Sequence, residues 1–242
     1  HQVFFGDRIV ESTQKAHLVR DLFEGGAEHY DLMNDLMSAG IHRRWKQAMV
    51  DALNPHQPLT MTDVAGGTGD IAFRVWNRLS KDIKPPRANH ITVCDFTEGM
   101  VFRGRDRALN EGIAQGIDFI VADAESLPLP DGSQDVVTNA FGIRNITNPA
   151  HAFNEARRVL RRGGRLLCLE FGGPVSSGIK PFYEAYASKI LPIIGMAIAG
   201  NSSAYRYLAE SIDRFPDREV VSKWIEGAGF SRVRARALSG GI

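Results

Sequence analysis

The fold is indicated by one stretch of the chain, Thr62-Asp63-Val64-Ala65-Gly66-Gly67-Thr68-Gly69-Asp70. It follows a break marked by prolines and precedes Ile71–Trp76, which has the pattern of a helix. A short apolar strand that runs into a glycine turn and then a helix is typical of a nucleotide-binding α/β fold. Gly67 and Gly69 let the backbone approach a ligand where a Cβ atom would collide with it.

Two carboxylates beside this turn bear on the kind of ligand. Asp63 stands at the predicted strand end, where it can meet a cationic group. Asp70 stands at the predicted helix start, where it would repel the pyrophosphate of a dinucleotide. Both features favour S-adenosylmethionine, which carries an ammonium and a sulfonium. The structural alternative is a tight strand-to-helix turn that binds nothing.

The composition of the chain limits the fold classes, partners and cellular location to be considered. The chain has 242 residues, of which 43% are hydrophobic, enough for one large α/β domain with a proper core. A net charge of +1 does not require a nucleic acid partner. Cys94 and Cys168 lie in apolar runs without metal-ligand spacing, so we expect reduced core thiols of an intracellular protein and no metal. No signal peptide and no long apolar span is apparent, and we expect that the start at His1 is trimmed.

Strands and helices alternate through the middle of the chain. The predicted strands are 60–65, 91–95, 118–122, 135–140 and 165–170. The helices predicted between them are 70–79, 98–110 and 150–160, with a turn at 161–164. This alternation predicts parallel βαβ units. The strands are continuous apolar runs, as expected where helices cover both faces of the sheet.

The remaining segments frame this core. Residues 1–20 are expected to form a polar tail that leads into a helix, and 172–215 an apolar helical insertion. Further helices are predicted at 30–40, 43–53, 205–212 and 217–228, before a last strand at 230–238. We expect one structural domain overall, with a tail and helical lid at 1–58 and a ligand-binding core at 59–242.

Polar residues stand at four predicted strand ends, where ligands bind in such sheets. Asp63 and the glycine turn follow the first strand, and Asp95 follows the second, placed to accept hydrogen bonds from a ribose. Asp123 and Ala124 follow the third, where a carboxylate and a backbone N–H suit an adenine edge. Phe141–Asn145 follows the fourth. One such Asp is more often a helix N-cap, but an ordered set favours a ligand site.

This set resembles the class I S-adenosylmethionine-dependent methyltransferases. More narrowly, the chain resembles the ubiquinone/menaquinone biosynthesis C-methyltransferases over nearly its whole length. The motifs that carry the narrower resemblance are Tyr30-Asp31-Leu32-Met33-Asn34-Asp35, Gly40-Ile41-His42-Arg43-Arg44-Trp45-Lys46 and Phe141-Gly142-Ile143-Arg144-Asn145. The pieces at Asp63–Asp70 and Asp123–Pro128 recur in many methyltransferases.

The resemblance implies a Rossmann-like, mostly parallel sheet that binds S-adenosylmethionine. By position it implies cofactor contacts at Thr68, Asp95, Asp123 and Ala124, beside Asp63, Gly67 and Gly69 of the turn. The implied reaction is methyl transfer to a ring carbon of a polyprenyl benzoquinol, of demethylmenaquinol, or of both. Partners compatible with it are a second copy of the chain, a quinone-biosynthesis complex and a membrane surface. The implied location is the bacterial cytoplasm or the mitochondrial matrix side of the inner membrane.

Three residues are candidates for the chemistry at the quinol ring. A hydroquinone carbon becomes nucleophilic when a ring hydroxyl loses its proton, so the enzyme needs a cation or donor that holds the phenolate. We assign that role to Arg144, with an ion pair at a surface or helix cap as the alternative. Tyr30 and Asn34 are spaced for one helix face and are expected to close over the sulfonium and ring, with simple helix packing as the alternative.

Other functions remain open from the sequence alone. One is a methyltransferase for a different lipid-like acceptor, and another is a non-catalytic S-adenosylmethionine-binding scaffold subunit of a quinone-biosynthesis complex. An NAD-dependent dehydrogenase is the weakest option. The resembling proteins continue into one more strand where this chain stops at Ile242, and we expect that end to be cut off or disordered.

Overall fold

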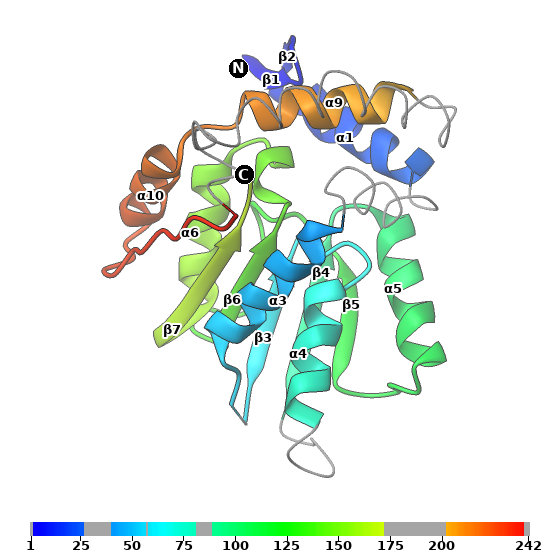
Figure 1. The fold of residues 1–242 in the computed structure, drawn as a ribbon, viewed down its shortest axis with the longest axis vertical. Coiled ribbons are helices and arrows are strands. Elements are labelled where there is room, and N and C mark those ends of the chain that lie inside the picture. The colour runs from blue at the N-terminus through cyan, green and yellow to red at the C-terminus, as the bar shows by residue number, and fades with distance from the viewer. Residues whose placement is uncertain (1, 27–39, 57, 81–88, 172–201, 240–242) are drawn as a thin grey trace. The chain divides into compact units, whose positions relative to one another are not determined.

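The computed structural model describes residues 2–26, 40–56, 58–80, 89–171 and 202–239, whose helices and strands are labelled in Figure 1. The chain divides into two compact units, residues 44–170 and residues 1–43 together with 171–242. The predicted boundary of a lid at residue 58 stays a prediction.

A five-stranded parallel sheet forms the middle of unit 44–170 (Figure 1). Its strands are β3 (Thr60–Val64), β4 (His90–Asp95), β5 (Ile117–Val121), β6 (Gln134–Ala140) and β7 (Leu160–Leu169). Their order in space is β5-β4-β3-β6-β7, and all four pairings are parallel. The predicted α/β fold is therefore confirmed. The winding reverses between β3 and β6, and ligands bind such sheets at the carboxyl ends of the strands beside the reversal.

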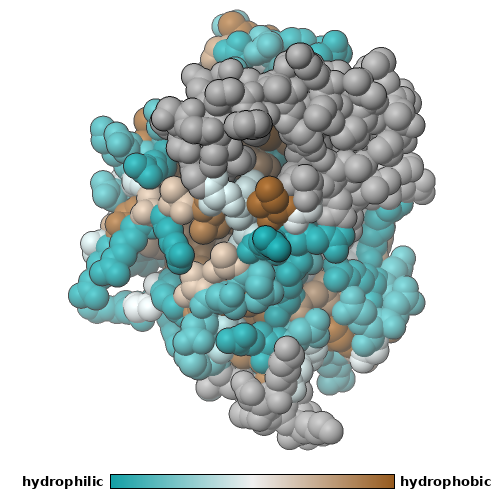
Figure 2. Space-filling model, viewed as in Figure 1, coloured by the Kyte–Doolittle hydropathy of each residue, from teal (hydrophilic) through white to brown (hydrophobic). Residues whose placement is uncertain are grey.

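Helices cover both faces of this sheet. They are α3 (Ile41–Leu53), α4 (Asp70–Ser80), α5 (Glu98–Asn110) and α6 (Pro149–Val159). In Figure 1, α3 and α4 lie in front of the sheet and α6 lies behind it. Apolar side chains of the front helices join those of the strands in one core cluster, including Val50, Leu53, Phe73, Val75, Met61 and Ile91. The outer faces in the region of α3 and α4 are mostly hydrophilic (Figure 2), as the amphipathic pattern of these helices requires.

The first segment of the chain corrects a prediction. Instead of a polar tail, the chain begins with an antiparallel hairpin of β1 (Gln2–Phe5) and β2 (Arg8–Glu11), followed by α1 (Ser12–Gly26). β-Branched residues occur in both strands and aromatic residues occur in β1. Gly6 in the turn between them has a φ of +56°.

The hairpin packs on α9 (Ser202–Asp213), which contains the predicted helix 205–212. The Phe5 and Tyr207 rings stack with centroids 4.4 Å apart. Asp7 accepts a hydrogen bond of 2.6 Å from the guanidinium of Arg214, just beyond the helix. Tertiary contacts of this kind, which span most of the chain, stabilise a hairpin that would be marginal alone.

Two predictions near the other end of the core are wrong. β7 begins at Leu160 rather than Arg165, because the expected turn is an irregular part of the strand whose pairing jumps between Gln134 and Val136. Residues 230–238 form no strand, although α10 (Arg218–Gly227) before them is confirmed. A strand requires a pairing partner, and alternation of arginines with small apolar residues does not supply one. In the described part of the chain, these residues pair with no other strand.

The cysteines and the possibility of a membrane span are the remaining features predicted from the sequence. Cys94 and Cys168 are free thiols, the first buried and the second half-buried. No helix within the described ranges is long and apolar enough to cross a membrane. Most of the predicted insertion, residues 172–201, lies outside the described residues.

Candidate active site

The glycine turn between β3 and α4 has a backbone that ordinary residues rarely adopt. Gly67 and Gly69 have φ values of +56° and +84°. A Cβ atom on Gly66 would lie 2.7 Å from Val93 Cγ1 and 2.8 Å from Asp63 Oδ2. A Cβ atom on Gly67, in contrast, would meet no heavy atom of the described residues within 4 Å. The turn is therefore packed against the sheet at Gly66 and open at Gly67, which fits the close approach of a ligand there.

Asp63 is a buried carboxyl at the end of β3. Its Oδ1 accepts a hydrogen bond of 2.7 Å from Thr138 Oγ1 on β6. Its Oδ2 is buried and has no hydrogen-bond partner among the described residues. Burial raises the pKa of Asp63 to about 7, against the lowering effects of Thr138 and Lys46. A buried oxygen without a donor fits the cationic ligand group that the sequence predicts at this position.

Asp95 lies at the end of β4, beside the glycine turn. Its Oδ2 accepts from the Gly67 N–H at 2.8 Å and its Oδ1 from the Thr97 N–H at 2.9 Å. Burial raises the pKa of Asp95, while these two backbone bonds oppose the shift. The carboxylate is thus fixed in orientation, and each oxygen keeps lone-pair capacity for a further donor such as a ribose hydroxyl. Thr68 is half-buried in the same turn.

Asp123 and Ala124 follow β5. The Ala122 N–H donates to the Asp95 carbonyl at 2.9 Å, which holds the start of this connection beside the end of β4. Asp123 Oδ1 accepts a hydrogen bond of 2.8 Å from the Glu125 N–H, and Ala124 is buried. The structure therefore brings Asp63, Asp95 and Asp123 to the carboxyl ends of three neighbouring strands, in the order the sequence predicts.

Arg144 lies in the short 3-10 turn η1 (Ile143–Asn145) after β6. One guanidinium nitrogen donates to the Phe141 carbonyl at 2.6 Å and to Glu170 Oε1 at 2.7 Å. The Arg144 and Glu170 side chains are only 4% and 5% exposed. Arg144 therefore forms a buried ion pair with Glu170, which differs from the ion pair at a surface or helix cap that the sequence left as the alternative.

Sequence reasoning missed three polar residues of this site. Lys46 Nζ lies 3.0 Å from Asp70 Oδ2, so the carboxylate at the start of α4 is neutralised. The buried Asn139 side chain donates to the Val64 carbonyl at 2.8 Å and accepts from the Ile143 N–H at 3.0 Å, linking the ends of β3 and β6. Glu170 holds Arg144. For Asn139 and Glu170 the available signal was a polar residue inside or just after an apolar strand, whereas Lys46 lies on helix α3 and carries no such signal. The predicted Tyr30 and Asn34 lie outside the described residues.

The sheet order and the strand-end carboxylates define the fold of a class I methyltransferase. Two solved structures support this at the level of the fold. A SAM-dependent methyltransferase of Thermotoga maritima gives a TM-score of 0.57 at 20% identity, covering 88% of this chain and 81% of its own. A SAM-dependent methyltransferase of Aquifex aeolicus gives 0.54 at 17%, covering 81% and 84%.

The chain belongs to the ubiE/COQ5 methyltransferase family, whose model matches residues 10–242. It is 47% identical over 240 residues to the ubiquinone/menaquinone biosynthesis C-methyltransferase UbiE of Methylobacterium nodulans, covering 98% of this chain and 92% of that protein. It is 46% identical over 241 residues to the UbiE of Paracoccus denitrificans, with coverages of 100% and 94%. Membership in a methyltransferase family removes the dehydrogenase alternative.

Proposed function

We propose that this protein transfers a methyl group from S-adenosylmethionine to a ring carbon of a reduced polyprenyl benzoquinol, of demethylmenaquinol, or of both. The observation that carries the proposal is near full-length identity of 45–47% to several proteins named as C-methyltransferases of ubiquinone and menaquinone biosynthesis. The strand-end carboxylates and the open glycine turn support it, because in the proposed site they would face the adenine, the ribose and the charged centre of S-adenosylmethionine.

The proposed cofactor site uses the strand ends in order. Asp95 would accept from the ribose hydroxyls, since two backbone N–H groups already fix its carboxylate. Asp123 and the Ala124 N–H would hold the adenine edge. The backbone at Gly67, Thr68 and Gly69 would approach the middle of the molecule, with the orphan oxygen of Asp63 nearby as a counter-charge. S-Adenosylmethionine supplies an electrophilic methyl group on its sulfonium.

The acceptor must be reduced for this chemistry. Loss of a hydroxyl proton from a quinol places negative charge on the ring carbons ortho and para to that oxygen, and the attacking carbon later loses its own proton. An oxidised quinone has no such nucleophilic carbon. Residues that hold the phenolate in line with the methyl group therefore lower the barrier.

Arg144 is the proposed partner of the phenolate. Glu170 and the Phe141 carbonyl fix the orientation of its guanidinium at the carboxyl end of the sheet. Tyr30 and Asn34 remain the further candidates for closing over the sulfonium and ring. A polyprenyl acceptor resides in lipid, so the proposal includes contact of the protein with a membrane surface.

The test is methyl transfer from labelled S-adenosylmethionine to short-chain demethylated benzoquinol and naphthoquinol, each with and without a reductant. The proposal predicts label in the quinol only in the reduced samples, and the accepted ring identifies the substrate. Cofactor binding without transfer to either reduced ring would overturn the proposed activity. That result would favour another lipid-like acceptor or a scaffold subunit.

A further inference from the structure

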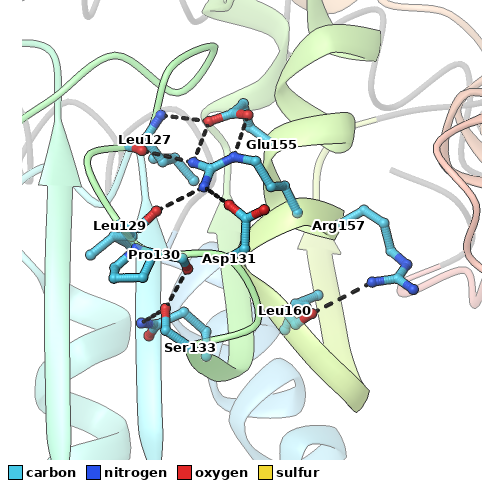
Figure 3. Close-up of polar contacts among 10 residues, drawn as sticks. Leu127, Leu129, Pro130, Asp131, Ser133, Glu155, Arg157 and Leu160 are labelled. Atoms are coloured by element: carbon cyan, nitrogen blue, oxygen red, sulfur yellow. Dashed lines mark hydrogen bonds and ion pairs between the residues drawn. The ribbon is translucent and has the colours of Figure 1, made fainter.

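One arginine on α6, Arg158, uses its whole guanidinium in hydrogen bonds. Figure 3 labels the residues that accept them, Leu127, Leu129, Asp131 and Glu155. Nε and one terminal nitrogen each donate at 2.8 Å to the two carboxylate oxygens of Glu155. The terminal nitrogens also donate to the carbonyls of Leu127 and Leu129 at 2.8 Å and to Asp131 Oδ1 at 2.6 Å. A guanidinium has five N–H donors, and each of them has an acceptor here. Bonds to Glu155 and then Asp131 raise the pKa of Arg158.

The partners of Arg158 apart from Glu155 lie in one segment, the connection from β5 to β6. This segment begins at Ala122, carries Asp123 and Ala124, and ends before Gln134. Glu155 adds a contact to it, because its Oε2 accepts from the Leu127 N–H at 2.9 Å. The Gly132 N–H donates to the carbonyl of Arg158 at 2.9 Å. Arg158 and Glu155 therefore hold the connection at several points along its length.

A second hydrogen bond holds the same connection to α6 closer to Asp123. Glu125 Oε1 accepts from the Asn148 N–H at 2.9 Å, at the N-cap of α6. Asp123 and Ser126 form an isolated bridge that closes a tight turn around Ala124. Among the hydrogen bonds of the described residues, none uses the N–H of Ala124 as a donor. The turn thus leaves one backbone donor available next to a carboxylate, which is the pattern an adenine edge requires.

We propose that Arg158 and Glu155 are positioning residues for recognition of the adenine base of the cofactor. The inference rests on the proposed function, in which Asp123 and Ala124 hold that base. Base recognition needs a donor and an acceptor fixed to within a fraction of an ångström, whereas a surface connection is mobile unless it is tied down. The Arg158–Glu155 pair supplies that fixation from a helix packed on the sheet, without contacting the ligand itself.

Arg157 provides a matched control on the same helix. It is exposed, and it donates a long hydrogen bond of 3.5 Å to the carbonyl of Leu160. Figure 3 shows its side chain directed away from the connection that Arg158 holds. Arg157→Ala therefore removes an arginine from α6 without touching the ties to Leu127, Leu129 and Asp131.

The experiment compares binding of S-adenosylhomocysteine and S-inosylhomocysteine by titration calorimetry. Inosine replaces the amino group of adenine with a carbonyl and carries a hydrogen on N1, so it reverses the pattern read by Asp123 and Ala124. The proteins are the unaltered chain, Arg158→Lys, Glu155→Gln and Arg157→Ala. Arg158→Lys keeps the charge but not the fork of donors. Circular dichroism checks that each variant is folded. If Arg158→Lys does not fold, the comparison is made with Glu155→Gln alone.

We expect the unaltered protein and Arg157→Ala to prefer the adenosyl compound. In Arg158→Lys and Glu155→Gln, affinity for the adenosyl compound should fall roughly tenfold, the cost of losing about one good hydrogen bond, while affinity for the inosyl compound changes little. An intact preference in both folded variants would overturn the inference, and so would an equal loss for both ligands. No preference in the unaltered protein would instead overturn the adenine assignment to Asp123 and Ala124, and the inference with it.

Discussion

At the residue level, the environment of Asp63 differs strongly from that of a free side chain. It is 1% exposed, one of its oxygens has no hydrogen-bond partner among the described residues, and burial raises its pKa from 3.8 to about 7. The folded protein therefore binds a proton at this site more tightly than the unfolded chain does. A bound cation would reverse this preference, because it favours the ionised carboxylate.

Asp63→Asn should change how stability depends on pH. The raised pKa contributes stability that is fully present below about pH 4 and is lost as the pH rises through about 7. The variant lacks this loss, so its free energy of unfolding should rise relative to the unaltered protein across that window. Because the pKa of Asp63 rises from 3.8 to about 7, this change in the free energy of unfolding is at most about 4 kcal/mol. Urea unfolding at a series of pH values without cofactor measures it.

The matched control is Asp106→Asn, which alters an exposed carboxyl on α5. The free energy of unfolding of Asp106→Asn, relative to that of the unaltered protein, should not rise across this pH window as that of Asp63→Asn does. A difference between Asp63→Asn and the unaltered protein that stays flat over the whole window would contradict the raised pKa.

Gly66→Ala should damage the turn more than Gly67→Ala. The new Cβ atom at Gly66 would collide with Val93 Cγ1 and Asp63 Oδ2. The one at Gly67 would contact none of the described residues, so it incurs only the cost of a positive φ, about 1 kcal/mol. We expect Gly66→Ala to lower stability by a few kcal/mol. Thermal unfolding of both variants without cofactor gives the order of their stabilities. A larger loss of stability in Gly67→Ala than in Gly66→Ala would contradict the tight packing around Gly66.

At the scale of elements, α3 and α4 are joined by a partly buried ion pair. Lys46 on α3 is 3.0 Å from Asp70 on α4, with side chains 9% and 23% exposed. Burial alone raises the pKa of Asp70, but Lys46, followed by Arg74, outweighs it and the net shift is downward. A second pair between the same helices, Arg78 with Asp51, is 3.9 Å long and largely exposed.

Lys46→Met should cost about 2 kcal/mol at neutral pH, because it leaves a partly buried carboxylate with less compensation. The lowered pKa of Asp70 contributes stability above its unfolded pKa of 3.8, and that contribution is lost as the pH falls. The difference between Lys46→Met and the unaltered protein should therefore shrink in acid. Arg78→Met, the exposed counterpart, should show almost no difference at any pH. Equal effects of the two substitutions in urea unfolding would rule out a special role for the buried pair.

The end of β7 and the turn after β6 form a second joined pair of elements, through Arg144 and Glu170. Under the proposed function, Arg144→Lys should lower kcat for methyl transfer by about tenfold or more and leave the affinity for S-adenosylmethionine within about twofold. Lysine keeps the charge but loses the planar fork. Steady-state rates beside direct binding separate the two quantities. Equal losses in rate and affinity would assign Arg144 to the support of the cofactor site instead.

The elements also show which parts of the fold the sequence predicts. β3 to β6 and the helices between them agree with their predicted ranges because each strand is one apolar run bounded by a turn, and both faces of the sheet are covered. The hairpin at Gln2–Glu11 was missed because its stability comes from α9, far away in the chain. The strand predicted at 230–238 is absent because alternation describes one face of a strand and says nothing about a pairing partner.

For the whole molecule, the candidate site follows from the topology more than from any single residue. A parallel sheet whose winding reverses beside β3 brings the ends of β3, β4 and β5 to one edge, so an Asp after each strand predicts a site. The ties of Arg158 to Leu127 and Leu129 link residues about 30 positions apart, and no local pattern predicts them. Pairings of that kind require the packed structure.

The proposed function requires transfer of the methyl group to a carbon atom of the ring. The most direct test supplies S-adenosylmethionine with a carbon-13 methyl group, together with a reduced demethylated quinol, and examines the product by NMR and mass spectrometry. We expect one added methyl group bonded to a ring carbon, with loss of one ring hydrogen and no product from the oxidised quinone. A labelled methyl group on a quinol oxygen, or transfer that does not depend on reduction of the ring, would contradict it.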